Sequence, residues 1–187
     1  EVVRAVQDCW ASLFEARAIF YRQEQGFDHL KVGIAVPVQR MVQSDTSGVI
    51  LTVEPITGDR SKLVVEAILA LGEAIVSGEV TPDLYVVDKA ELKIVEKKVG
   101  SQEWQLVKSP IRSLGRLEAN IKVSISPALR SRQKMPDKDI LALAQWGKKI
   151  EELYQFPQDI EWAKEGPNFY IVQARPITTL RAEAKPQ

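Results

Sequence analysis

Residues 159–176 read Asp-Ile-Glu-Trp-Ala-Lys-Glu-Gly-Pro-Asn-Phe-Tyr-Ile-Val-Gln-Ala-Arg-Pro, and this stretch decides the fold. Two runs rich in apolar and aromatic residues flank a turn-forming segment, a pattern that is typical of an antiparallel hairpin. Glu161 lies in the first run, and Gln173 and Arg175 lie in the second. Because residues two apart in a strand share a face, Gln173 and Arg175 are expected to point the same way.

The face on which Glu161 lies depends on the turn register. A turn centred on Pro167 places Glu161 opposite Gln173, and a turn centred on Gly166 places it opposite Ile171, on the same face. A centre halfway between Gly166 and Pro167 would turn Glu161 to the other side. Together on one face, a carboxylate, an amide oxygen and a guanidinium suit a polyphosphate bound with Mg²⁺. The alternative is a surface Glu–Arg pair on an amphipathic strand.

Composition is that of an ordinary globular domain. The chain has 187 residues, of which 45% are hydrophobic and 27% are charged, and at this length one domain is the default. Lys+Arg and Asp+Glu are equal at 25 each, so no basic field points to nucleic acid or to an acidic membrane surface. No apolar stretch is long enough to span a membrane and no signal peptide is visible, so we expect a cytoplasmic protein.

The two ends suggest a piece of a longer polypeptide. Residue 1 is not methionine, and helical spacing of apolar residues is already in progress there. Residues 181–187 are polar and contain proline, as in a linker. We therefore expect one domain over residues 1–180, followed by a linker over 181–187.

Between the ends, helical and strand patterns alternate. Helices are expected from about Val2 to Tyr21 and from Asp137, a candidate N-cap, to Tyr154. Strands are expected at 32–42, 49–53, 63–67, 84–87 and 92–98, and the last two are expected to form a hairpin around Asp88-Lys89-Ala90. Pro37 indicates that the first is an edge strand or contains a bulge. Residues 100–136 show no clear pattern. Taken together, these expected helices and strands predict an α+β fold with a mostly antiparallel sheet and helices packed on it.

Several residues have structural interpretations. Cys9 falls in an apolar helical stripe and is expected to be buried, and Trp10, Trp146 and Trp162 are expected to pack in or near the core. The only histidine, His29, is expected to be an exposed loop residue, and one cysteine with one histidine cannot form a zinc cluster. The chain has no glycine-rich phosphate loop of the standard kinds.

The order of several motifs resembles a known family. The motifs are Val-Pro-Val-Gln-Arg-Met-Val at 36–42, Ser-Gly-Val-Ile-Leu-Thr-Val-Glu-Pro-Ile-Thr-Gly at 47–58, Leu-Gly-Glu-Ala-Ile-Val-Ser-Gly-Glu-Val-Thr-Pro-Asp at 71–83, and the two halves of the hairpin described above. Together they resemble phosphoenolpyruvate synthase. More broadly, they are similar to the nucleotide-binding domain that this enzyme shares with pyruvate phosphate dikinase and rifampicin phosphotransferase. The resemblance covers nearly the whole chain.

This resemblance implies an ATP-grasp-like lobe that binds ATP with Mg²⁺. In the family, a phosphoryl group passes from ATP to a histidine on a separate domain, and phosphoenolpyruvate is then made from pyruvate. Carried over by position, Gln39, Met41 and Val42 would line the adenine slot and Glu161 and Gln173 would hold the metal. Arg175 would grip the phosphates as the catalytic arginine.

Departures from the family pattern limit what the chain is expected to do alone. The family also uses a lysine and an Arg-Ser-Ser segment from an N-terminal lobe, and neither is recognisable here, nor is a phosphohistidine motif. The chain is therefore expected to be the C-terminal part of the ATP-binding domain, inactive in isolation. Two alternatives stay open: an enzyme of the rifampicin phosphotransferase type, and a non-catalytic nucleotide-binding or docking module.

Overall fold

The computed structural model of the chain describes residues 2–109, 112–113, 116–117 and 120–178, and the expected linker at 181–187 lies outside them. The described chain forms two compact units. One consists of residues 1–41 with 113–117, and the other of residues 42–112 with 118–187. The second unit contains the whole of a six-stranded sheet and both hydrophobic core clusters.

The first unit is helical, and its helix is broken where the sequence pattern predicted continuity. It contains α1 (Val2–Ala11), the 3₁₀ turn η1 (Ser12–Phe14) and α2 (Ala16–Glu24). The break lies at Glu15, whose backbone is extended with φ −68° and ψ 148°. The buried side chain of Arg22 bridges the break, because its guanidinium donates to the Leu13 carbonyl at 2.6 Å and to His29 Nδ1 at 3.1 Å.

Two predictions for this unit are wrong. Cys9 is exposed, because α1 buries none of its residues within the described part of the chain. Residues 32–44 form no strand, although their composition favours one. A strand needs hydrogen bonds to a neighbouring strand, and this segment pairs with none among the described residues, while Pro37 has no N–H to offer.

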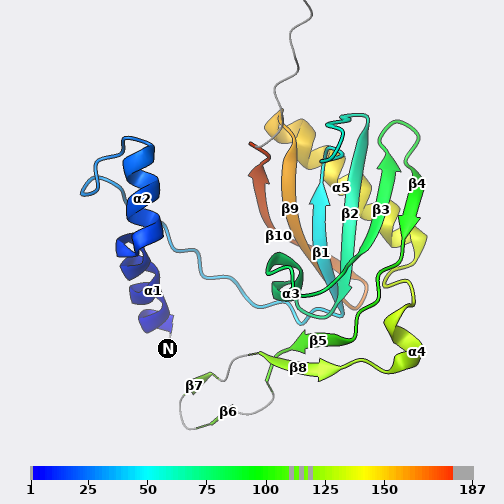
Figure 1. Cartoon of the computed structure of the whole chain (residues 1–187), viewed down its shortest axis with the longest axis horizontal. Coiled ribbons are helices and arrows are strands. Elements are labelled where there is room, and N and C mark those ends of the chain that lie inside the picture. The colour runs from blue at the N-terminus through cyan, green and yellow to red at the C-terminus, as the bar shows by residue number, and fades with distance from the viewer. Residues whose placement is uncertain (1, 110–111, 114–115, 118–119, 179–187) are drawn as a thin grey trace, which may run out of the picture. The chain divides into compact units, whose positions relative to one another are not determined.

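The second unit is built on an antiparallel sheet in the order β10-β9-β1-β2-β3-β4 (Figure 1). Its strands are β1 (Thr46–Leu51), β2 (Lys62–Leu69), β3 (Asp83–Asp88), β4 (Lys93–Lys98), β9 (Gln158–Glu165) and β10 (Asn168–Pro176). The predicted β3–β4 and β9–β10 hairpins are both confirmed. The fold class predicted from the sequence, α+β with a mostly antiparallel sheet and packed helices, is thereby confirmed.

One face of the sheet is covered by α5 (Asp137–Tyr154), which runs behind the strands in Figure 1. The helix has the bounds predicted from its apolar spacing, although Pro136 rather than Asp137 is its N-cap. The main core cluster lies between them and includes Ile50, Leu63, Val65, Tyr85, Ile140, Leu143, Ile160 and Trp162. Of the three tryptophans expected to pack in or near the core, Trp162 is buried at 2% exposure, whereas Trp10 and Trp146 lie at the surface with about half of their area exposed, 53% and 46%.

Gly48 sets the close spacing between β1 and its neighbours. A Cβ added there would lie 1.9 Å from the Glu66 carbonyl oxygen and 2.9 Å from a ring carbon of Trp162. Only glycine therefore allows β1 to pack this tightly against β2 and the core.

The remaining elements form an excursion between β4 and α5. They are β5 (Trp104–Val107), β6 (Arg112–Ser113), β7 (Arg116–Leu117), β8 (Ile121–Ser124) and α4 (Pro127–Arg130), with β5 paired to β8. We call the part of this excursion from Gly100 to Lys134 that belongs to the second unit the arm. Leu106 of β5 joins Ile68, Leu71 and Ala74 in the second core cluster, which also holds the short helix α3 (Glu73–Val76).

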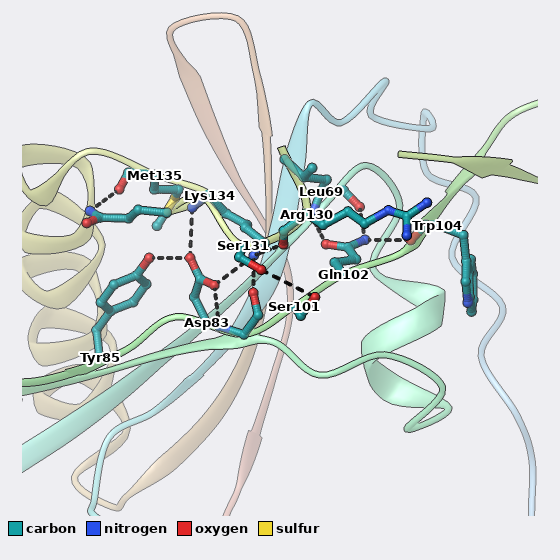
Figure 2. Close-up of polar contacts among 12 residues, drawn as sticks. Leu69, Asp83, Tyr85, Ser101, Gln102, Trp104, Arg130, Ser131, Lys134 and Met135 are labelled. Carbon is teal, nitrogen blue, oxygen red and sulfur yellow. Dashed lines mark hydrogen bonds and ion pairs between the residues drawn. The ribbon is translucent and has the colours of Figure 1, made fainter. Parts of the chain in front are cut away.

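A buried polar network fixes the base of the arm (Figure 2). The ion pair between Lys134 Nζ and Asp83 Oδ1 spans 3.0 Å, with side-chain exposures of 1% and 0%. Asp83 also accepts from the backbone N–H of Gly100 at 2.9 Å and of Lys134 at 2.7 Å, and from the Tyr85 hydroxyl at 2.7 Å. Lys134 Nζ donates in addition to the carbonyls of Gly100 and Arg130. We call Asp83, Tyr85, Gly100 and Lys134 the Asp83 staple.

Candidate functional site

The predicted site residues of the hairpin lie on the face of the sheet that is turned away from α5, called the site face below. Strand pairing places Gln173 opposite Glu161 and Arg175 opposite Asp159. Continued across β1, β2 and β3, the first pair belongs to a row that reads Gln173, Glu161, Val49, Glu66, Leu84. The second belongs to the next row, Arg175, Asp159, Leu51, Val64, Val86.

The β9–β10 hairpin combines a turn centre that would not pair Glu161 with Gln173 and a bulge that restores this pair. Glu165 pairs with Asn168, so the loop is Gly166-Pro167 and its centre lies halfway between the two residues. Gly166 has φ 56°, as the first loop residue of a tight hairpin requires. A halfway centre alone would have turned Glu161 away from Gln173. The register shifts between Ile171 and Gln173, and the extra residue, Val172, restores the pair.

Arg175 is held by a carboxylate that sequence reasoning left unassigned. Its Nε donates to Asp159 Oδ2 at 2.9 Å, and its second terminal nitrogen lies 2.8 Å from the same oxygen. The Arg175 side chain stays 61% exposed while that of Asp159 is 19% exposed. These hydrogen bonds, and then the charges of Asp159 and Glu161, raise the pKa of Arg175. Asp159 could have been found from the sequence, because it lies two residues before Glu161 on the same strand face.

Glu66 is a second residue of the site face that sequence reasoning missed. It is half-buried in the row of Glu161, and burial, followed by the charge of Asp159, raises the pKa of its carboxyl. The signal was a single acid in the otherwise apolar run Leu-Val-Val-Glu-Ala at 63–67.

Charge on the site face is unbalanced. The part of the site face formed by β2, β9 and β10 carries the carboxylates of Glu66, Asp159 and Glu161 and the guanidinium of Arg175. The two rows continue onto β4 with Lys98 and Glu96, which form an ion pair with each other. An anionic ligand would therefore need an accompanying cation at this face. The described residues contain no group of three or more His, Cys, Asp or Glu side chains arranged to hold a metal ion. Glu161 and Gln173 nevertheless offer two hard oxygen ligands, a number that suits Mg²⁺ when phosphate oxygens and waters complete its shell.

The three residues expected to line an adenine slot are divided between the two units. Gln39 and Met41 belong to the first unit and Val42 to the second, and all three lie in the segment without regular secondary structure. Because the two units are described separately, an adenine slot formed by these three residues stays a prediction. The chain just after Val42 is tied to the hairpin, because Asp45 donates its N–H to the Lys164 carbonyl at 2.8 Å and accepts from the Gly166 N–H at 2.8 Å.

The family model described as the pyruvate phosphate dikinase AMP/ATP-binding domain matches residues 1–187. The chain belongs to this family.

Curated relatives agree with the family assignment. This AMP/ATP-binding domain is 45% identical to a phosphoenolpyruvate synthase of Pyrococcus furiosus over 98% of the chain, and 43% identical to that of Aquifex aeolicus over 95%. It is also 41% identical to a rifampicin phosphotransferase of Bacillus cereus over 96% of the chain. The chain spans 23%, 22% and 20% of the length of these three proteins, respectively.

The part of the synthases that resembles this AMP/ATP-binding domain is their N-terminal part, not their C-terminal part. The narrower expectation, that the chain is the C-terminal portion of the ATP-binding domain itself, stays a prediction. Within the described residues, no helix is both long and apolar enough to cross a membrane.

Proposed function

We propose that this domain binds Mg-ATP on the site face and supplies part of the machinery that transfers a phosphoryl group from ATP to a histidine on another domain. The observation that carries the proposal is the register of the β9–β10 hairpin. It sets the Glu161–Gln173 pair beside the Asp159–Arg175 pair on one face. Membership of an AMP/ATP-binding family supports the choice of nucleotide.

Each polar residue of the two pairs has a distinct part in this proposal. Glu161 and Gln173 would hold the Mg²⁺, which neutralises phosphate charge when it is bound. Arg175 grips the phosphates as a planar donor, which can meet two phosphate oxygens at once. Asp159 keeps the guanidinium oriented before the ligand arrives, so less side-chain entropy is lost on binding.

The adenine end of the ligand is assigned to the segment that enters β1. Gln39, Met41 and Val42 form the proposed slot, and the ties from Asp45 to the hairpin fix where that segment meets the sheet. Transfer forms a nitrogen–phosphorus bond to the histidine as a phosphorus–oxygen bond of ATP breaks, and positioning and charge neutralisation dominate such reactions.

The parent enzyme is proposed to be a phosphoenolpyruvate synthase, with pyruvate as the final acceptor. Similarity to the Pyrococcus and Aquifex synthases over nearly the whole chain supports this choice. Beside the two site pairs, the described site face supplies Arg175 as a phosphate-binding cation, whereas Lys98 on β4 is paired with Glu96, so further phosphate ligands are proposed to come from another lobe. Each charged hydrogen bond is worth about 1.5–3 kcal/mol, and the isolated chain is therefore expected to turn over nothing.

A second candidate is an enzyme of the rifampicin phosphotransferase type. The 41% identity to the Bacillus cereus protein favours it. The site face would serve both enzymes in the same way, since only the final phosphate acceptor differs.

The test is formation of phosphohistidine in the full-length protein. Glu161→Ala and Arg175→Ala should each abolish transfer of label from ATP to protein, with unchanged circular dichroism. Glu96→Ala is the matched control, because Glu96 forms an exposed ion pair with Lys98 on the opposite edge strand. Wild-type labelling in both site variants would remove the site assignment, and binding of Mg-ATP without any labelling in the wild type would favour a non-catalytic module.

A further inference from the structure

The residues of β10 do not lie on the faces that a regular strand would give them. Phe169, Ile171, Gln173 and Arg175 are each two residues apart, so a regular strand would place all four on one face. In the structure, Phe169 and Ile171 pack against the main core cluster. Gln173 and Arg175 are instead exposed on the opposite face.

The conflict is resolved by one extra residue. Ile171 pairs with Trp162 and Gln173 pairs with Glu161, so Val172 has no residue of its own on β9 and forms a bulge. Two residues of a bulged strand oppose one residue of its neighbour, and the local twist of the strand increases. The extra residue lies between the partner of Trp162 and the partner of Glu161, and it is adjacent to Gln173. The bulge thus lies at the proposed metal pair and not elsewhere along the hairpin.

We propose that Val172 is a positioning residue: by adding a residue to β10 between the partners of Trp162 and Glu161, it sets the course of the backbone that aims the Gln173 amide at the ion held by Glu161. This inference rests on the proposed function. The Val172 side chain offers no ligand atom and is 39% exposed. Val172 therefore acts through the extra backbone residue that it adds to the strand. The Arg175–Asp159 pair lies beyond the bulge in regular register and is expected to be less sensitive.

A competing explanation is that the bulge only protects a sheet edge from pairing with another chain. The same sheet offers the control, because its other edge strand also carries a single valine bulge. On β4, Ile94 pairs with Val87 and Glu96 pairs with Val86, which leaves Val95 as the extra residue. The two bulges match in residue type and edge position, and they differ in that only one adjoins the site pairs.

The experiment compares deletion of Val172 with deletion of Val95 in the full-length protein. Deleting Val172 leaves Gln173 opposite Glu161 and Arg175 opposite Asp159, so every site residue is retained and only the backbone course changes. The Mg²⁺ concentration that half-saturates ATP binding is measured by calorimetry, and metal-free ATP binding is measured in chelator. We expect deletion of Val172 to raise the Mg²⁺ requirement about 10- to 100-fold, the usual cost when a group that orients a metal ligand is lost. Metal-free binding, and both readouts after deletion of Val95, should stay unchanged.

A second variant guards against a folding failure. Deletion of Val172 combined with insertion of one alanine between Arg175 and Pro176 keeps the strand length and all pairings but moves the bulge past the site. It should show the same raised Mg²⁺ requirement. A wild-type requirement in either folded Val172 variant, or an equal rise on deletion of Val95, would overturn the inference. Glu161→Gln is run alongside: if it also binds Mg-ATP like the wild type, the proposed function fails and the inference with it.

Discussion

Glu66 is the carboxylate of the site face whose environment is least favourable to its charge. It lies two strands from Glu161 in the same row, with Val49 between them. Burial is the larger cause of its raised pKa and the charge of Asp159 is the smaller. Loss of its proton therefore acts against the folded state.

The pH dependence follows from the sign of that shift. A raised pKa means that the folded state binds the proton more tightly, so the contribution of Glu66 is most favourable at low pH and is lost as pH rises through the folded-state pKa. Glu66→Gln should thus raise the free energy of unfolding at pH 7, and the gain should shrink as pH falls through the raised folded-state pKa and vanish below the ordinary value of 4.5. Urea unfolding at several pH values measures it, and a gain that is the same at every pH would contradict the assignment.

Trp162 gives a second prediction at the scale of single residues. Its ring is 2% exposed and meets Phe169 edge-on at 6.2 Å between centroids. Trp162→Ala should lower the free energy of unfolding by about 3–5 kcal/mol, the usual cost of deleting a buried aromatic side chain. Trp146→Ala, at a position 46% exposed, is the matched control and should cost far less in the same denaturant titration.

At the scale of elements, the sequence predicts those whose pattern is satisfied locally. Helix α5 and the β3–β4 and β9–β10 hairpins formed as expected because their periodicity and turn residues suffice. Residues 32–42 failed as a strand because strand composition cannot supply a hydrogen-bonding neighbour. The break at Glu15 was invisible because the apolar spacing continues across it.

The site could be predicted only in part, because a sequence pattern does not fix which residues of two strands pair. Strand parity placed Gln173 and Arg175 together, but the facing of Glu161 depended on a register that the residues left open. Phe169 and Ile171 have the same parity as Gln173 and Arg175, so a regular strand could not place the first two in the core and the last two on the site face. That mismatch indicated an extra residue in β10. The parity of β9 placed Asp159 on the same face as Glu161, but its partner, Arg175, is shown only by the hydrogen bonds of the folded hairpin.

The arm gives a prediction at this scale. Lys134→Met would leave Asp83 buried without its cation, and breaking a buried ion pair from one side costs about 3–5 kcal/mol. Lys98→Met removes the exposed partner of Glu96, with side-chain exposures of 72% and 48%, and should cost about 0–1 kcal/mol. Thermal unfolding compares the two. Equal costs would mean that the Asp83 staple is not what fixes the arm.

At the scale of the whole molecule, the two units differ in their cores. Both clusters of buried apolar residues lie within residues 42–178, whereas Arg22 is the only buried residue described in residues 2–41. Residues 42–187 should therefore fold without residues 1–41, with cooperative thermal unfolding retained. Hydrogen exchange of the intact chain should be fast in α1 and α2 and slow in β1, β2 and α5. Loss of cooperative unfolding on truncation would contradict this division.

The Asp83 staple has a consequence for how the domain can vary. Gly100 and Lys134 are tied to the same carboxylate, so the chain leaves the sheet and returns to it at one point. A loop closed in this way can grow or shrink without pulling on the strands, because the extra entropy cost rises only slowly with length. Insertions and deletions among relatives should therefore gather inside the arm. An epitope or fluorescent tag grafted there should leave the nucleotide face undisturbed.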